Sequence, residues 1–338
     1  TAIRDFVAWA YHEWQSPPVS SVLLVGEPNL DARNWLGNSP FHHHMPTHFT
    51  VTSAQGETPS DTWFAAVDGH DELPDAAVGR FSVRDAATAS ALAAKIIDYE
   101  NNPPHGLAWG ERAVHVASSS AVFEDSLEGA AQYLPPGFVV DPEYRLSGAS
   151  ATSIRNAINA GALIVSFVGH GNVPYWADNP GGPFFTTSNV AALSNAGRLP
   201  LVTALNCLNG LVADPFTPDS MAEVFHNDPD TGALAMWSPS ALGFLSQYDT
   251  LQEVLYRTMF QDRVARIGSA TTGALVESWL TAPISIDLVR EMILLADPSG
   301  PLALPCDTGQ PDAICNGYDD DCDDEVDEDY VPLATSCG

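Results

Sequence analysis

Two short apolar stretches decide the fold: residues 162–168, which read Ala-Leu-Ile-Val-Ser-Phe-Val, and residues 199–205, which read Leu-Pro-Leu-Val-Thr-Ala-Leu. Each leads into a turn, Gly-His-Gly-Asn from residue 169 and Asn-Cys-Leu-Asn-Gly from residue 206. Short apolar runs bounded by turn residues are typical of buried strands in a parallel sheet. Because functional groups in such sheets gather where the strands end, we expect His170 and Cys207 to lie at one edge.

Strand and helix patterns alternate on both sides of these two stretches. Their spacing predicts further strands over 21–25, 63–67, 77–81, 113–118 and 233–236, and an irregular segment over 29–57. It also predicts helices over 4–14, 85–100, 127–133, 151–160, 188–196, 221–226 and 250–261. This alternation is typical of an α/β fold with mostly parallel sheets flanked by helices.

The composition excludes several classes of partner. The chain has 338 residues and a formal net charge of −30, from 43 acidic and 13 basic side chains. Such a surface repels phosphate backbones and anionic lipid, so we expect neither nucleic acid nor membrane partners. No apolar run is long enough to cross a bilayer. The chain opens with neither an initiator methionine nor a signal peptide, so we expect a mature part of a longer precursor.

The cysteines separate the body of the chain from its tail. Four of the five fall in the last 33 positions, at Cys306, Cys315, Cys322 and Cys337, whereas Cys207 stands alone. An even set in a polar segment indicates disulfides and therefore a secreted or cell-surface protein. Beyond Leu304 the chain is rich in aspartate and has no basic residue. We therefore treat residues 304–338 as an irregular acidic tail outside the core.

The tail offers oxygen ligands of the kind that Ca²⁺ prefers. It resembles the short Cys- and Asp-rich metal-binding repeats of large bacterial surface proteins, and a disulfide between Cys315 and Cys322 would close the loop. The alternative is a disordered acidic spacer. The expected calcium ligands are Asn316, Asp319, Asp321, Asp323 and Asp327.

A histidine and a cysteine at neighbouring strand ends form a plausible nucleophilic site. An imidazole that takes the proton of a thiol makes the sulfur a strong nucleophile toward a carbonyl carbon. Gly171 lets the backbone approach a carbonyl closely, and its N–H together with that of Cys207 could form an oxyanion hole. This arrangement serves acyl transfer. The alternative for Cys207 is an ordinary buried cysteine.

The segments around both residues resemble the gingipain family of cysteine peptidases, which belongs to the caspase-like clan. The most specific matches are Gly169-His170-Gly171 and residues 206–210, and weaker ones cover 22–26, 78–82 and 296–299. The resemblance spans roughly residues 5 to 302. It implies a caspase-like fold of two α/β subdomains, residues 1–104 and a catalytic subdomain of residues 105–303.

The resemblance also implies roles for individual residues. His170 would be the general base or imidazolium partner, Cys207 the nucleophile, and the amides of Gly171 and Cys207 the oxyanion hole. The family's acid beside the histidine falls near Ser120, which carries no charge. The implied substrate contacts are Asp125, Glu124, Trp237 and Ser240, and the implied structural calcium ligands are Asp68, Asp71 and Glu72.

The sequence therefore predicts a secreted bacterial cysteine endopeptidase that acts on proteins or peptides through an acyl-enzyme, with cleavage after Arg or Lys as one option. Two alternatives remain: a sortase-like transpeptidase of the same clan, and a catalytically silent calcium-binding adhesion module. A histidine cluster at His42, His43, His44 and His48 fits no specific metal-ligand spacing, which favours a solvated loop. No organic cofactor is expected.

Overall fold

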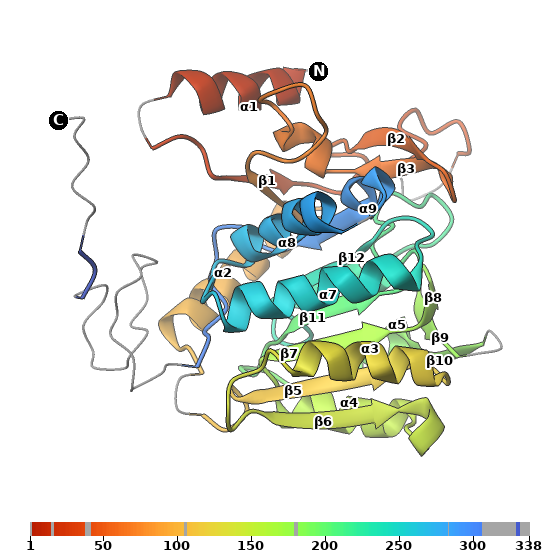
Figure 1. Ribbon diagram of the computed structural model, residues 1–338. Coiled ribbons are helices and arrows are strands. Elements are labelled where there is room, and N and C mark those ends of the chain that lie inside the picture. The colour runs from red at the N-terminus through yellow and green to blue at the C-terminus, as the bar shows by residue number, and fades with distance from the viewer. Residues whose placement is uncertain are drawn as a thin grey trace.

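The computed structural model describes residues 2–14, 17–37, 42–104, 107–178, 182–282, 284–305 and 329–331. A six-stranded sheet forms its centre, and the strands are ordered β13-β12-β11-β7-β5-β6 (Figure 1). Five of them run parallel, and β13 pairs antiparallel with β12 at one edge. The strands are β5 (Arg112–Ala117), β6 (Val139–Tyr144), β7 (Ile164–Val168), β11 (Leu201–Leu205), β12 (Ala235–Pro239) and β13 (Met292–Leu295).

Alternate side chains of the central strands fill two separate cores, one on each face of the sheet. In β7, Ile164 and Val168 belong to one core, whereas Val165 and Phe167 belong to the other. All five residues of β7 are buried, and the same is true of β11. Burial on both faces explains why these strands read as continuous apolar runs.

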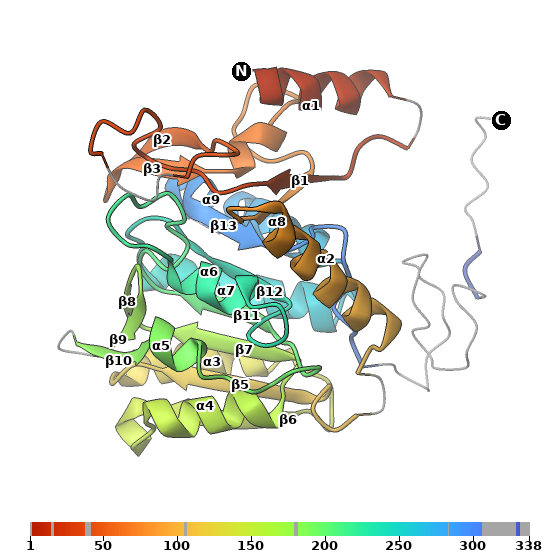
Figure 2. The same cartoon turned by 180° about the vertical axis from the view of Figure 1, so that it is seen from behind.

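Helices cover both faces of this sheet. One face carries α3 (Ala121–Ala131), α7 (Leu245–Phe260) and α8 (Ile267–Thr281) (Figure 1). The opposite face carries α4 (Ala151–Ala160), α5 (Thr187–Val190) and α6 (Met221–Asn227) (Figure 2). The short helix α9 (Ile286–Glu291) leads directly into β13. The Ser150 hydroxyl caps α4 by accepting a hydrogen bond from the Ser153 N–H, as expected of a serine at a helix start.

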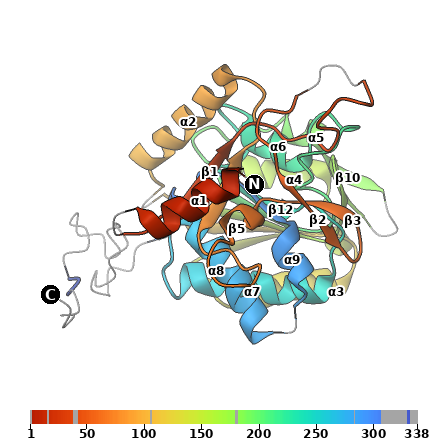
Figure 3. The same cartoon turned by 90° about the horizontal axis from the view of Figure 1, so that it is seen from above.

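A smaller N-terminal unit lies beside the β13 edge of the sheet (Figure 2), and α1 faces the viewer when the molecule is seen from above (Figure 3). It comprises α1 (Ala2–Glu13), β1 (Ser21–Val25), β2 (His48–Thr52), β3 (Gly56–Ser60), η1 (Thr62–Ala65) and β4 (Ala77–Phe81). The strands β1 and β4 pair in parallel, and β2 and β3 form an antiparallel hairpin. The helix α2 (Ala86–Asn101) then connects this unit to β5. The expected boundary at residue 104 lies between α2 and β5.

The buried guanidinium of Arg80 holds the N-terminal unit together. It donates two hydrogen bonds of 2.7 Å to the Asp61 carboxylate and others to the backbone carbonyls of Gly26, Met45 and Pro46. A buried charge requires this degree of pairing. This arrangement anchors the ends of β1 and β4 to the hairpin.

The predicted fold class, α/β with a mostly parallel sheet flanked by helices, is confirmed, but some predicted elements are wrong. Residues 62–65 form a 3₁₀ helix instead of a strand, and the segment thought irregular contains β2 and the start of β3. The helix predicted over 188–196 is only the single turn α5, which begins after a capping box at Thr186. The hydrogen bonds that follow, such as that from the Leu193 N–H to the Val190 carbonyl, form isolated turns. Nearly all of the acidic tail, including its four cysteines, lies outside the described residues.

No helix in the described ranges combines the length and the apolar character that crossing a lipid bilayer demands.

Candidate active site

The register of the central sheet brings His170 and Cys207 to the same edge. In the parallel pair β7 and β11, the last residues, Val168 and Leu205, lie opposite each other. His170 and Cys207 each follow two positions after these paired strand ends. The two segments touch at Gly171, where a Cβ would come within 2.0 Å of Asn206 Nδ2 and 2.8 Å of the Cys207 carbonyl oxygen. Only glycine permits this approach. The sequence prediction that these strand ends meet is confirmed.

Two buried asparagine side chains connect the cysteine segment to the histidine segment. Asn206 Nδ2 donates to Asn209 Oδ1 at 2.7 Å, and Asn209 Nδ2 donates to the carbonyls of Asn172 and Tyr175 at 2.6 and 3.3 Å. Between them Leu208 adopts a left-handed backbone conformation, with φ of 67°. Sequence reasoning assigned these asparagines no role, although two asparagines flanking a cysteine are a usable signal, because buried amides must find partners.

The histidine begins a small antiparallel sheet at the carboxyl edge of the central strands. It contains β8 (His170–Asn172), β9 (Tyr175–Ala177) and β10 (Pro183–Thr186) (Figure 1). Trp176 of β9 is fully buried and stacks on Phe167 of β7, with ring centroids 4.4 Å apart. This contact ties the small sheet to the core and so fixes the start of β8.

The His170 side chain is exposed, and its ring meets the edge of Phe123 on α3 at a centroid distance of 5.4 Å. Its backbone N–H donates to the Ser118 hydroxyl at 3.3 Å. Ser120, where the family's supporting acid would fall, is the N-cap of α3. Among the described residues no carboxylate is hydrogen-bonded to the His170 ring, so packing against Phe123 orients the imidazole.

Cys207 is the free cysteine of the described chain and is partly buried. Burial raises the pKa of its thiol, the nearby Glu291 carboxyl raises it further, and a hydrogen bond from the Gly243 N–H lowers it. Within the described residues the Cys207 backbone N–H has no hydrogen-bond acceptor. It is therefore available to bind an oxyanion, as the sequence reasoning expects.

The four expected substrate contacts fall into two groups. Asp125 is exposed on α3, and Glu124 beside it is half-buried, with a pKa raised by burial and by the charges of Glu128 and Asp125. Trp237 and Ser240 are 1% and 0% exposed. Trp237 packs in a core, and the Ser240 hydroxyl donates to the Pro59 carbonyl at 2.7 Å. Both side chains are therefore buried in this structure, and their role as substrate contacts stays a prediction.

Calcium binding by Asp68, Asp71 and Glu72 stays a prediction, and two of these side chains have other partners. Glu72 makes a bidentate ion pair with Arg290, at 2.6 and 2.8 Å, and Asp71 accepts the Leu73 N–H in a local turn. In the described part of the chain no three histidine, cysteine, aspartate or glutamate side chains lie close enough together to hold a metal. This finding includes Asp68 and the histidine cluster at His42, His43, His44 and His48. The tail residues Asn316, Asp319, Asp321, Asp323 and Asp327 lie outside the described residues.

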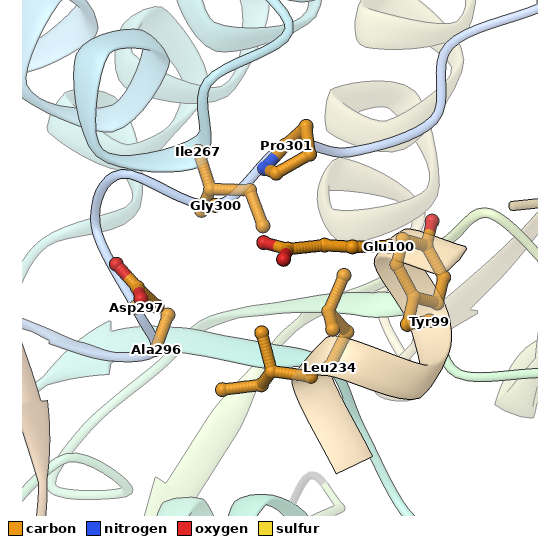
Figure 4. Close-up of a pocket in the computed structure, with 9 residues that line it drawn as sticks. Tyr99, Glu100, Leu234, Ile267, Ala296, Asp297, Gly300 and Pro301 are labelled. Carbon is orange, nitrogen blue, oxygen red and sulfur yellow. The ribbon is translucent and has the colours of Figure 1, made fainter. Parts of the chain in front are cut away.

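A small pocket at the opposite edge of the sheet is unrelated to this site. It is lined by side chains of α2, the start of α8 and the segment after β13, among them Tyr99, Glu100, Leu234 and Asp297 (Figure 4). Leu234 precedes β12, and residues 296–301 follow the antiparallel β13, so the pocket lies where the parallel strands begin. His170 and Cys207 lie where those strands end.

Comparison of the sequence with known proteins identifies a family and its relatives. A model of peptidase family C25 matches residues 1–303. Gingipain R2 and gingipain R1 of Porphyromonas gingivalis are each 24% identical over 246 residues, 70% of this chain. The matched region is 30% of the length of the first and 22% of the second, so the chain corresponds to less than a third of either protein.

Two solved structures share the fold. The crystal structure of the Arg specific cysteine proteinase gingipain R has a TM-score of 0.72 and 20% identity, covering 89% of this chain and 68% of the other. The complex of Porphyromonas gingivalis RgpB pro- and mature domains has a TM-score of 0.72 and 19% identity, covering 89% and 69%. With the family model matching residues 1–303, the chain belongs to peptidase family C25.

Proposed function

We propose that this protein is a cysteine endopeptidase with Cys207 as its nucleophile and His170 as its general base. The observation that carries the proposal is the junction at Gly171, where the asparagine pair connects the two strand ends. Membership of a peptidase family supports the same chemistry. This family membership favours neither the sortase-like transpeptidase nor the calcium-binding adhesion module.

The state of the thiol determines the order of proton transfer. Because burial raises the pKa of Cys207, the resting sulfur is protonated at neutral pH. His170 therefore takes the proton as the sulfur attacks the substrate carbonyl carbon, and the Cys207 and Gly171 N–H groups stabilise the resulting oxyanion. The imidazolium then protonates the leaving amine, which leaves an acyl-enzyme. Water, deprotonated by His170, hydrolyses the thioester and restores the thiol.

Basic side chains before the cleaved bond are the substrates that suit this surface. The chain has a net charge of −30, and Asp125 and Glu124 lie in the early turns of α3, next to the residue that contacts His170. A solved relative is described as Arg specific. We therefore propose cleavage after Arg or Lys, with Asp125 as the main acidic contact and Glu124 as the second.

The protein is further proposed to act outside the cell, on protein or peptide substrates. The cysteine-rich acidic tail supports export, since disulfides persist in oxidising compartments. Calcium is the metal proposed for the tail's aspartates, whose hard oxygen ligands suit it. A calcium titration of the full chain followed by calorimetry would test this, and the absence of a binding isotherm would contradict it.

A cleavage-site profile on a denatured peptide library tests the proposed activity. The full chain is compared with Cys207→Ala, His170→Ala and Asp125→Asn variants, with product masses read by spectrometry. Both dyad variants should lose cleavage, by at least about a thousandfold in kcat/KM, because nucleophile and base act as a unit. Asp125→Asn should weaken cleavage after Arg and Lys selectively.

Cleavage that persists in Cys207→Ala would contradict the nucleophile assignment. Cleavage after uncharged residues in the parent protein would contradict the role of Asp125 and Glu124 without affecting the dyad. An added amine incorporated in preference to water would indicate transpeptidation instead.

A further inference from the structure

A buried carboxyl group that the proposed mechanism does not use lies behind Cys207. Glu291, the last residue of α9, is 2% exposed. Its Oε1 lies 3.1 Å from the Tyr248 hydroxyl on α7, and that hydroxyl donates to the carbonyl of Asn206 at 2.9 Å. Glu291 therefore reaches, through one tyrosine, the peptide group that precedes the nucleophile.

The same carboxyl lies against the loop at residues 242–244. A Cβ on Gly243 would come within 1.8 Å of the Tyr248 hydroxyl and 2.8 Å of Glu291 Oε1, so the loop backbone rests directly on this pair. The Gly243 N–H lowers the pKa of the Cys207 thiol, whereas Glu291 raises it.

The backbone of Glu291 holds the start of this loop as well. Its carbonyl accepts the Ser240 N–H at 2.7 Å and the Ser240 hydroxyl at 3.0 Å. The carbonyl of the next residue, Ala241, accepts the N–H of Leu208, the residue after the nucleophile, at 3.1 Å. The start of the loop is therefore held both by Glu291 and by the cysteine segment.

We propose that Glu291 is the positioning residue of the nucleophile: its side chain, through Tyr248, fixes the Asn206 carbonyl, and its backbone carbonyl fixes the loop that binds the residue after Cys207. The proposal rests on the proposed function, because it assigns a role within that catalytic site. Glu291 touches neither substrate nor the reacting atoms and acts through its neighbours.

The charge of Glu291 sets the pH range in which this arrangement favours the thiolate. The pKa of Glu291 is raised to about 8. Burial is the main cause, the hydrogen bond with Tyr248 acts against it, and the Asp287 charge on α9 adds to it. The titratable groups that face it are Tyr248, Cys207 and Asp287, and no cation is among the causes of its shift. At neutral pH the carboxyl is uncharged. Above about pH 8 its negative charge opposes ionisation of the thiol.

A cavity gives Glu291 access to protons. It has a volume of about 40 Å³ and is lined by α9, the loop at residues 242–244 and the turn between β2 and β3. Glu291 and Gly243 both border it. A volume of this size holds water, so the buried carboxyl can exchange its proton with solvent.

The test measures the rate at which iodoacetamide alkylates Cys207 as a function of pH, in the full chain and in Glu291→Gln. This readout needs no peptidase activity. The amide keeps the shape but never ionises, so the apparent pKa of the thiol should fall by about one unit in the variant. The matched control is Glu223→Gln, since Glu223 is equally buried and has a pKa raised to about 8 but does not act on Cys207.

A second variant keeps the proposal testable if Glu291→Gln does not fold. Tyr248→Phe keeps Glu291 but removes both hydrogen bonds, and alkylation of Cys207 at neutral pH should slow by at least about threefold. Profiles of both variants that superimpose on the parent profile would overturn the proposal and leave the peptidase assignment intact. Persistent cleavage by Cys207→Ala would instead overturn the proposed function without changing the alkylation result.

Discussion

At the scale of single residues, the site depends on backbone approaches that side chains would prevent. Gly171 meets the cysteine segment, and Leu208 accepts a left-handed conformation that costs a branched residue free energy. Buried amides on both sides stabilise this geometry by hydrogen bonds. The strained residue, Leu208, therefore follows the nucleophile directly, and this local geometry fixes the direction of the Cys207 N–H.

Replacing Gly171 with alanine should abolish most activity. The new Cβ would overlap Asn206 Nδ2 and press on the Cys207 carbonyl oxygen, so the two strand ends must separate. We expect a loss of about 1–3 kcal/mol in the free energy of unfolding, typical of overpacking, together with a fall in kcat/KM of at least about a hundredfold. Urea unfolding and peptide cleavage measure the two effects.

The matched control for that change is Gly273→Ala. Gly273 is exposed within α8 and has no heavy atom within 4 Å of an added Cβ. Alanine should therefore stabilise the helix by about 0.5–1 kcal/mol and leave cleavage unaltered. A Gly171→Ala protein as active as this control would refute the close-approach argument.

At the scale of elements, the small β8–β10 sheet positions His170 through one aromatic stack. Trp176 lies between Phe167 of β7 and Phe185 of β10, with centroids 4.4 and 4.9 Å away, and Phe225 of α6 completes the stack. The stack joins the small sheet to the core on the face opposite α3. The position of His170 thus depends on how this aromatic stack packs behind the small sheet.

Trp176→Ala should therefore reduce stability and activity together. Removing a fully buried indole costs about 3–5 kcal/mol of unfolding free energy, and the loosened β9 releases its partner strand β8. The control is Trp35→Ala, since Trp35 is 81% exposed and its loss should change stability by less than about 0.5 kcal/mol. Equal unfolding midpoints for the two variants would contradict this assignment.

Sequence patterns predicted the elements that local physics determines. The strands ending near His170 and Cys207 are buried on both faces, so their apolar runs are unambiguous, and Ser150 marks the start of α4 by its cap. The β2–β3 hairpin was missed because its pairing, and not an apolar run, stabilises it. Glu291, Tyr248 and Gly243 were missed because a contact between α9, α7 and a loop leaves no periodic signal.

At the scale of the whole molecule, charged and polar groups buried between the N-terminal unit and the main sheet hold them together. Lys95 on α2 donates to three carbonyls, those of His226, Asp228 and Ala233, at 2.5–3.1 Å. The Ser82 hydroxyl, just after β4, donates to Glu223 on α6 at 2.7 Å. The two units are therefore coupled next to the segment that carries Cys207.

Glu223 makes this coupling dependent on pH. Its second carboxylate oxygen accepts the Ser220 N–H at 2.8 Å, and burial raises its pKa to about 8. The unfolded chain releases this proton near the ordinary glutamate pKa of about 4.3, whereas the folded chain keeps it until about pH 8. Between these values the folded state binds more protons, so its stabilising contribution is full at low pH and is lost as the pH rises through the folded pKa.

Glu223→Gln should remove that dependence. The difference in unfolding free energy between the parent and the variant, measured by urea denaturation, should shift against the parent by about 2 kcal/mol from about pH 6 to pH 8, because one pKa unit corresponds to about 1.4 kcal/mol. Other titrating groups are common to both proteins and cancel in the difference. A difference that stays constant over this interval would show that Glu223 is already ionised in the folded protein, and the carboxylate would then have to be stabilised by its two hydrogen bonds alone.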